Sequence, residues 1–224
     1  SKKENNFSII EINSETDFVA KNDEFINFSE EVAKIALESK GKMENILLSK
    51  MENKKSVNDN LIDLVTKIGE KITLRRSSFI ESTNTINFSY IHGAQKENVG
   101  KLGVLVAIET NKTKKDIMLL GKHIAMQIAS SSPLSINQND LNKDLIEKEK
   151  EIIVEELKSS GKDTKIIDKI AVGKLKKFID ENTLMNQDWI MEPKKKVKDI
   201  IKEFAGKEKI EVKEFIRFKV GEGL

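Results

Sequence analysis

The sequence predicts an α+β fold of two similar small subdomains, each an antiparallel sheet with helices, and an inserted antiparallel helical hairpin. Three observations support this fold. Stretches with an apolar period of two residues alternate with stretches of helical period. The strand-then-helix pattern that begins at residue 12 recurs from residue 108, which indicates an internal repeat. A charged helical stretch at residues 141–187 interrupts the second copy.

The first half of the chain contains both periods. Phe25, Phe28 and Val32 recur at a spacing of three to four residues, which is typical of one buried helical face. Gly69 marks the end of a later helix, because glycine suits the residue that follows a helix. The predicted elements are a strand at 7–12, helices at 23–37, 43–56 and 60–68, and strands at 71–80 and 85–92.

The second half repeats the pattern around the charged insertion. Residues 104–108 have the apolar density of a central strand, and residues 114–130 form an amphipathic helix. Within the insertion, two helices separated by a break at 159–162 carry their own apolar stripe, so they must close on each other or on another chain. Pro193 is expected to open a helix, and a last strand begins near residue 210.

Composition argues against several classes of protein. The 224 residues include 39 basic and 37 acidic side chains, so the net charge of +2 argues against nucleic acid as the main partner. No apolar run approaches the roughly 20 residues that cross a bilayer, and we expect a soluble, cytoplasmic protein without a membrane partner. The chain has no cysteine, and its two histidines, His92 and His123, lie on separate elements, so no metal site is supported.

No catalytic motif or cofactor site stands out. Gly93 and Gly100 superficially suggest a phosphate loop, but six residues separate them where the motif requires four, and Leu102 stands where Ser or Thr is required. The basic run at 193–198 is typical of a solvated helix face in a chain of balanced charge. We therefore expect no enzymatic activity and no cofactor.

A strand passes into a helix between residues 11 and 22. Thr16 and Asp17 can supply side-chain oxygens to the free N–H groups of a first helical turn, and the pair Phe18-Val19 follows directly. Taken alone, these residues favour a structural interpretation, a helix cap with a hydrophobic staple.

Several segments resemble the bacterial elongation factor Ts family, the guanine-nucleotide exchange factors of the translational GTPase elongation factor Tu. Together these segments sample almost the whole chain. They are residues 11–22, 90–93, 103–106, 123–126, 215–218 and 220–223.

The resemblance implies a role for the junction. The matching family segment is implicated in displacing the magnesium ion from the GTPase, with its aromatic residue acting as an apolar wedge. In this chain the matching residues are Thr16, Asp17, Phe18 and Val19.

The resemblance also implies two further contact surfaces. His92 and Gly93 match positions that the family uses at the interface with elongation factor Tu. His92 follows a predicted strand, so its ring can project from a turn, but a structural histidine is an equally good interpretation. The stretch at 141–187 matches a family hairpin that serves in dimerisation.

We expect the chain to bind elongation factor Tu in its GDP-bound form and to promote GDP release by disturbing the magnesium and phosphate site. The alternative is a non-exchanging helical adaptor or an RNA-binding protein. In the family a small helical module precedes this region, so a chain that begins at Ser1 is expected to be truncated or processed. The predicted domains are a first core subdomain at 1–88, a second at 89–140 and 188–224, and the hairpin at 141–187, through which a homodimer can form.

Overall fold

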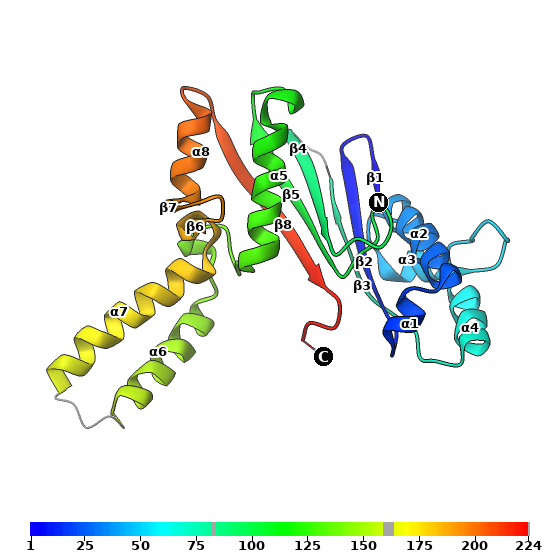
Figure 1. Ribbon diagram of the computed structural model, residues 1–224, viewed down its shortest axis with the longest axis horizontal. Coiled ribbons are helices and arrows are strands. Elements are labelled where there is room, and N and C mark those ends of the chain that lie inside the picture. Colours follow the sequence, from blue (N-terminus) through cyan, green and yellow to red (C-terminus); the bar gives the residue numbers. More distant parts are fainter. Residues whose placement is uncertain (82–83, 159–163, 224) are drawn as a thin grey trace. The chain divides into compact units, whose positions relative to one another are not determined.

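The computed structural model describes residues 1–81, 84–158 and 164–223, which belong to two compact units (Figure 1). Unit 1 comprises Ser1–Ala129 and Lys209–Leu224, and unit 2 comprises Ser130–Glu208. Helices and antiparallel strands occur together in both units, which confirms the α+β class. The similarity of two subdomains, and their boundaries after residues 88 and 140, stay predictions.

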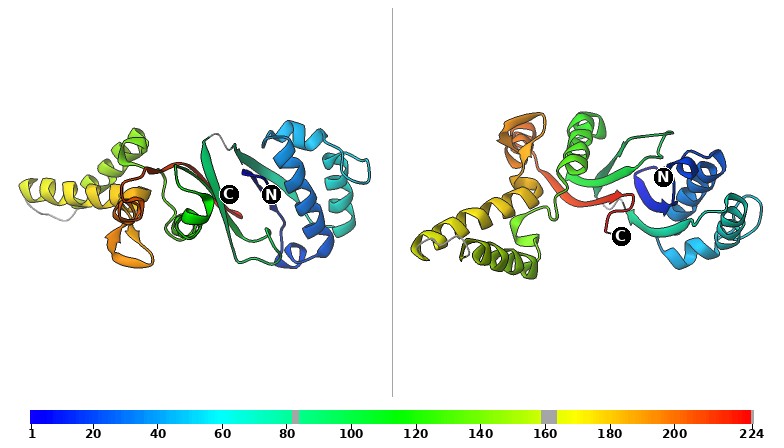
Figure 2. Two further views of the ribbon diagram at one scale, coloured as in Figure 1. Left: turned by 90° about the horizontal axis from the view of Figure 1, so that it is seen from above. Right: turned by 60° about the horizontal axis from the view of Figure 1, so that its bottom comes forward.

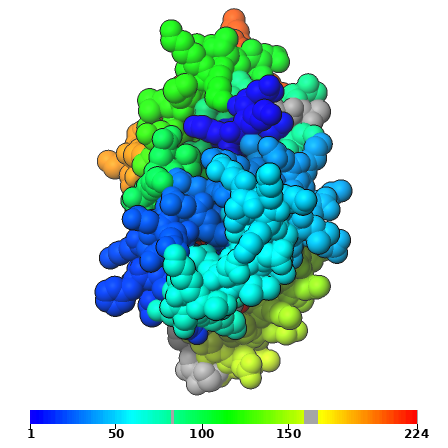
Figure 3. Space-filling model, turned by 90° about the vertical axis from the view of Figure 1, so that its right-hand side faces the viewer, coloured from blue at the N-terminus to red at the C-terminus, as the bar shows by residue number. Residues whose placement is uncertain are grey.

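The first sheet of unit 1 carries a cluster of helices. Its antiparallel strands, in the order β1-β2-β3, are β1 (Lys2–Lys3), β2 (Asn6–Asn13) and β3 (Thr73–Ile80). The helices between β2 and β3 are α1 (Asp17–Ala20), α2 (Asp23–Glu38), α3 (Met43–Leu48) and α4 (Val57–Ile68). Phe28 of α2, Ile46 of α3 and Leu64 of α4 share one core, against which Ile10 and Ile12 of β2 pack. The helices therefore cover one face of this sheet, and their outer surface is seen in blue to cyan in Figure 3.

The second sheet of unit 1 is built around a buried central strand. Its antiparallel strands, in the order β4-β5-β8, are β4 (Thr85–His92), β5 (Leu102–Thr110) and β8 (Ile210–Lys219). Residues 103–108 of β5 are all buried, which confirms the predicted central strand. Helix α5 (Lys114–Ser131) lies close to β4, because a Cβ atom added at Gly121 would be 2.4 Å from the Phe88 ring.

The two sheets of unit 1 pack together through apolar side chains, and their strands are seen from two further sides in Figure 2. A Cβ atom on Gly103 of β5 would lie 2.7 Å from the Ile9 side chain of β2, so glycine permits the close approach of these strands. The buried residues of this core are Phe7, Ile9, Ile80, Leu105 and Ala107.

A buried carboxylate joins the first sheet to the segment that follows β8. Glu11 of β2 accepts hydrogen bonds from Arg75 at 3.0 Å, from Arg76, and from the Gly221 N–H at 2.9 Å. Arg75 also donates to the Glu222 carbonyl at 2.8 Å. Because a buried charge is tolerated only when it is paired and hydrogen-bonded, this cluster fixes β2, β3 and the segment after β8 together.

Unit 2 consists of a helical hairpin, a small two-stranded sheet, one further α-helix and two short 3-10 helices. The hairpin is formed by α6 (Lys143–Lys158) and α7 (Thr164–Asn182), and the sheet by β6 (Asp188–Trp189) and β7 (Glu192–Lys196). The further helix is α8 (Val197–Ala205), and the 3-10 helices are η1 (Gln138–Asp140) and η2 (Leu184–Asn186). Ile153 and Leu157 of α6 pack against Ile167 and Ala171 of α7, which confirms a hairpin that closes on itself. The predicted break at residues 159–162 lies outside the described residues.

Two predicted helices differ from the structure. Pro193 lies in β7, and α8 begins four residues later at Val197. Proline lacks an N–H donor and so suits an edge strand of a two-stranded sheet. Within residues 43–56 only Met43–Leu48 is helical, because Ser49 is extended and Lys54 adopts a left-handed conformation in the turn that follows.

Candidate functional site

Helix α1 turns Phe18 outward and Val19 inward. Thr16 precedes the helix in an extended conformation and its hydroxyl accepts a hydrogen bond from the Val19 N–H at 3.4 Å, which confirms its predicted capping role. Successive residues of a helix point about 100° apart. Since Val19 is buried in the core that α2 lines, the Phe18 side chain faces solvent and is 88% exposed. A staple ring would pack against the helix, so the staple interpretation is wrong for Phe18.

The connection into α1 is held by the segment that follows α4. Thr16 donates both its N–H and its hydroxyl to the Glu70 carboxylate, at distances of 2.9 to 3.1 Å. Lys71 in turn donates its N–H to the Glu15 carboxylate at 3.3 Å. Gly69, in the left-handed conformation with φ of 78°, turns the chain out of α4 into this segment. Thr16 is thereby fixed through its backbone and its side chain.

Asp17 carries an exposed negative charge beside Phe18. Its carboxylate lies 2.9 Å from Lys101 Nζ, and the hydrogen bond and positive charge of Lys101 lower the pKa of Asp17. The group is therefore ionised at neutral pH. Ion pairs between exposed side chains contribute little to stability, so a binding partner can separate this pair at small cost.

His92 and Gly93 lie at the end of β4 and are both exposed. The His92 Nδ1 atom is 3.1 Å from the Tyr90 hydroxyl, so one ring nitrogen has a partner within its own strand. Gly93 has φ of 63°, and the space where a Cβ atom would stand is open. Another molecule can therefore approach the backbone closely at this position.

Two ion pairs join the loop between β4 and β5 to the helices of the first sheet. Lys96 Nζ lies 2.8 Å from the Glu30 carboxylate of α2, and Lys101 pairs with Asp17 of α1. His92 lies opposite Leu102 in the sheet register, next to Lys101. The α1 turn, residues 16–20, is thus joined to the end of the β4–β5 hairpin that carries His92.

Sequence reasoning missed the residues that hold this site. Glu70 and Lys101 contact the α1 turn from positions 54 and 84 residues away in sequence, and no local pattern identifies them. Asn22 could have been found, because its side chain accepts hydrogen bonds from the Glu24 and Phe25 N–H groups as the cap of α2. Asparagine directly before an amphipathic helix is a recognisable start signal.

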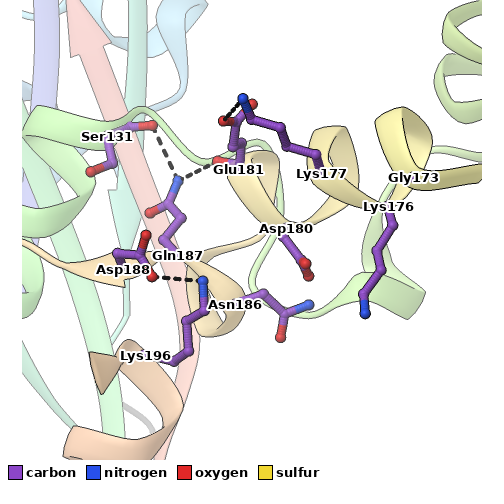
Figure 4. A pocket seen from close by; sticks show the side chains of 10 residues that line it. All are labelled: Ser131, Gly173, Lys176, Lys177, Asp180, Glu181, Asn186, Gln187, Asp188 and Lys196. Carbon is purple, nitrogen blue, oxygen red and sulfur yellow. Dashed lines mark hydrogen bonds and ion pairs between the residues drawn. The ribbon is translucent and has the colours of Figure 1, made fainter. Parts of the chain in front are cut away.

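A separate polar cavity of about 550 Å³ lies in unit 2 (Figure 4). Lys196 pairs with Asp188 at 2.6 Å, and the Gln187 amide donates to the Ser131 and Glu181 carbonyls at 3.1 and 2.7 Å. Among the described residues that line this cavity, none is a histidine or a cysteine.

Within residues 1–81, 84–158 and 164–223, no group of three or more histidine, cysteine or acidic side chains is placed to hold a metal ion. None of the described helices combines the length and the apolar character that crossing a bilayer requires.

Comparisons with known proteins agree on one family. The family described as elongation factor TS matches residues 15–222. Elongation factor Ts of Rickettsia prowazekii is 38% identical over 220 residues, which is 97% of this chain and 71% of that protein. Elongation factor Ts of Methylorubrum populi is 38% identical with the same coverage. The protein of that name from Bartonella tribocorum is 38% identical over an alignment of 227 positions that covers 99% of this chain and 73% of that protein.

Proposed function

Since the chain belongs to the elongation factor Ts family of translation elongation factors, we propose that it binds GDP-bound elongation factor Tu and promotes GDP release. One observation carries the proposal: Phe18 is 88% exposed on a turn that Thr16 caps and in which Asp17 is paired and Val19 is buried. A large apolar side chain held in solvent by a rigid turn is suited to entering a partner.

The proposed mechanism is a linkage between two binding events. If the chain weakens the binding of GDP, then GDP weakens the binding of the chain by the same factor, and exchange passes through a ternary state. GTPases hold their nucleotide through a magnesium ion that bridges the phosphates and the protein. A residue that pushes the magnesium-binding segment away therefore lowers the affinity for GDP efficiently.

Each of residues 16–19 has a proposed part in this step. Phe18 enters elongation factor Tu as an apolar wedge, and the ionised Asp17 brings acceptor oxygens and negative charge to the same point. Val19 anchors the turn in the core, and Thr16 caps it. Because hydrogen bonds to Thr16 hold the backbone of this turn before binding, little backbone conformational freedom is lost when the partner is engaged.

His92 and Gly93 form a second proposed contact. His92→Ala should slow stimulated GDP release about fivefold, which corresponds to the roughly 1 kcal/mol that one hydrogen bond contributes. The melting temperature should stay unchanged because the ring is exposed. Stopped-flow release of a fluorescent GDP analogue measures the rate, with Gln95→Ala in the same connection as the control. A large melting shift with normal release would instead identify a structural histidine.

The hairpin of α6 and α7 is the proposed surface of a homodimer. Its seam is already filled from within the chain, so association must use outward side chains such as Ile152 and Val172, which are 60% and 70% exposed. We expect Ile152→Gln combined with Val172→Gln to lower the mass in sedimentation and to leave melting unchanged. The seam variant Ile153→Gln should lower the melting temperature. Dimers that persist in the double variant would contradict this surface.

The test of the proposed function is GDP release from elongation factor Tu with and without this chain. We expect release to accelerate with the concentration of the chain and to reach a plateau, as a ternary intermediate requires. If the chain binds elongation factor Tu without accelerating release, the non-exchanging adaptor is the better description. If the chain binds RNA and does not bind elongation factor Tu, an RNA-binding protein is the better description.

A further inference from the structure

We propose that Glu70 is a positioning residue for nucleotide exchange, which holds the α1 turn so that Phe18 projects in one direction. This inference rests on the proposed function. Glu70 lies outside the segment at 16–19 and outside the end of the β4–β5 hairpin that carries His92. The proposal is based on the hydrogen bonds between Glu70 and Thr16.

Glu70 fixes the orientation of the Thr16 hydroxyl. A hydroxyl has one hydrogen to donate and two lone pairs that accept. The Thr16 hydroxyl donates to both Glu70 carboxylate oxygens, at 2.9 and 3.1 Å, and accepts from the Val19 N–H at 3.4 Å. With its hydrogen directed to Glu70, the oxygen presents a lone pair to α1. The carboxylate therefore sets the cap in the orientation that the helix needs.

Glu70 also fixes the Thr16 backbone, whose N–H donates to the carboxylate at 3.1 Å. Hydrogen bonds to an ionised acceptor are about twice as strong as those between neutral groups. The reciprocal bond from the Lys71 N–H to Glu15 joins the same two segments a second time. Residues 15–16 and 70–71 thus form a clamp made of one carboxylate from each side.

The residues on both sides of Glu70 are held by the fold. Gly69 ends α4 in the left-handed conformation and donates to the Val65 carbonyl at 2.8 Å. Ile72, two residues after Glu70, is 5% exposed and belongs to the core that α2 lines. Glu70 therefore stands between a helix end and a core residue, and neither can move without disturbing the fold.

Helix α1 needs such support because it has only four residues. Isolated helices of that length do not persist in water, since the first turn costs more conformational entropy than its hydrogen bonds return. Val19 ties one side of the turn to the core, while the Phe18 ring, at 88% exposure, has little protein around it to set its direction. The backbone of α1 thus sets where the Cα–Cβ bond of Phe18 points, and the Thr16 cap holds that backbone.

The effect should appear in the maximal rate of stimulated GDP release and not in affinity. Displacement of a reacting group by about 1 Å costs on the order of 10²-fold in rate, and partial loosening of a capped turn should cost less. We expect Glu70→Ala to lower the maximal rate about tenfold. The concentration of the chain that gives half the maximal rate should change less than about twofold, because the rest of the interface is untouched.

Three further variants test the assignment. Glu70→Gln keeps oxygen and nitrogen atoms in place but loses the charge, so its rate should lie between those of wild type and Glu70→Ala. Glu24→Gln is the matched control, because Glu24 also connects α4 to an earlier helix, by an ion pair with Lys67 at 2.6 Å. It should release GDP at the wild-type rate. In a Phe18→Ala background, Glu70→Ala should cause no further loss, since there is no ring left to position.

Amide hydrogen exchange gives a readout that does not depend on elongation factor Tu. The Val19 amide should be protected in wild type and should exchange faster in Glu70→Ala, while the amides of α2 and the melting temperature stay unchanged. Equal protection of Val19 in both proteins would overturn the clamp. A Glu70→Ala chain with the wild-type maximal rate, or with the same loss in both Phe18 backgrounds, would overturn its role in exchange. If wild type itself fails to accelerate release, the proposed function falls and the clamp survives only as support for α1.

Discussion

Phe18→Ala should lower stimulated GDP release about ten- to a hundredfold while the chain melts nearly as wild type does. Burying a Phe side chain in a partner is worth roughly 1.5 to 3 kcal/mol, and each ~1.4 kcal/mol is a factor of ten. The ring is 88% exposed in the free chain, so its removal deletes almost no contact of the fold. Release of a fluorescent GDP analogue and thermal unfolding, measured on the same preparation, check both halves of the expectation.

Two controls separate the wedge from a general apolar effect. Leu48→Ala removes another exposed apolar side chain of unit 1, 77% exposed at the end of α3, and should leave release unchanged. Phe25→Ala removes a buried ring from α2 and should cost about 3 to 5 kcal/mol of stability. A Phe18→Ala chain that unfolds, or that releases GDP at the wild-type rate, would contradict the wedge.

Glu11→Gln should lower the free energy of unfolding by about 3 kcal/mol. Removing one partner of a buried ion pair typically costs about 3 to 5 kcal/mol. We expect the lower end because Arg75 and Arg76 keep 22% and 33% of their side chains exposed, so solvent can compensate them in part. Urea unfolding measures the loss. The matched control is Glu81→Gln, because the pair of Glu81 with Lys40 is exposed and should contribute less than about 1 kcal/mol.

The stability that Glu11 confers should disappear in acid. Burial alone raises the pKa of Glu11, but the Gly221 N–H and the Arg75 and Arg76 guanidinium groups outweigh burial, so the folded pKa lies below the ordinary value. A lowered folded pKa gives stability that is fully present above the unfolded pKa, about 4.3 for glutamate, and is lost as the pH falls through the folded pKa. The difference in unfolding free energy between wild type and Glu11→Gln should therefore narrow below about pH 4. A constant difference across this range would contradict the role of the charge.

Local patterns predicted local structure well in this chain. The helix predicted at 23–37 is observed as Asp23–Glu38, and the strand predicted at 85–92 is Thr85–His92. Both depend on a period that neighbouring residues display among themselves. Pro193 shows the limit of such rules, since its fixed φ and missing N–H suit a helix start and an edge strand alike, and here the pairing of β6 with β7 decides.

Contacts between residues far apart in the chain could not be predicted from the sequence. Glu11 meets Gly221 across 210 residues, and nothing near either residue signals the pairing. The same holds for Thr16 and Glu70, because many acidic residues could serve and only the fold selects one. Phe18 is a further case: its neighbours predict a cap, but its outward direction depends on Val19 entering the core. The identity of the candidate site residues thus came from a resemblance, and their support came from tertiary structure.

The mechanism through magnesium is tested most directly by measuring GDP release from elongation factor Tu with the metal present and with the metal chelated. With magnesium present, wild type should accelerate release strongly and Phe18→Ala should accelerate it about ten- to a hundredfold less. After chelation, the acceleration by wild type should shrink and the two proteins should become nearly equal, because the step that Phe18 promotes has already taken place. The same acceleration with and without magnesium, or an undiminished deficit of Phe18→Ala after chelation, would contradict the proposed action at the magnesium site.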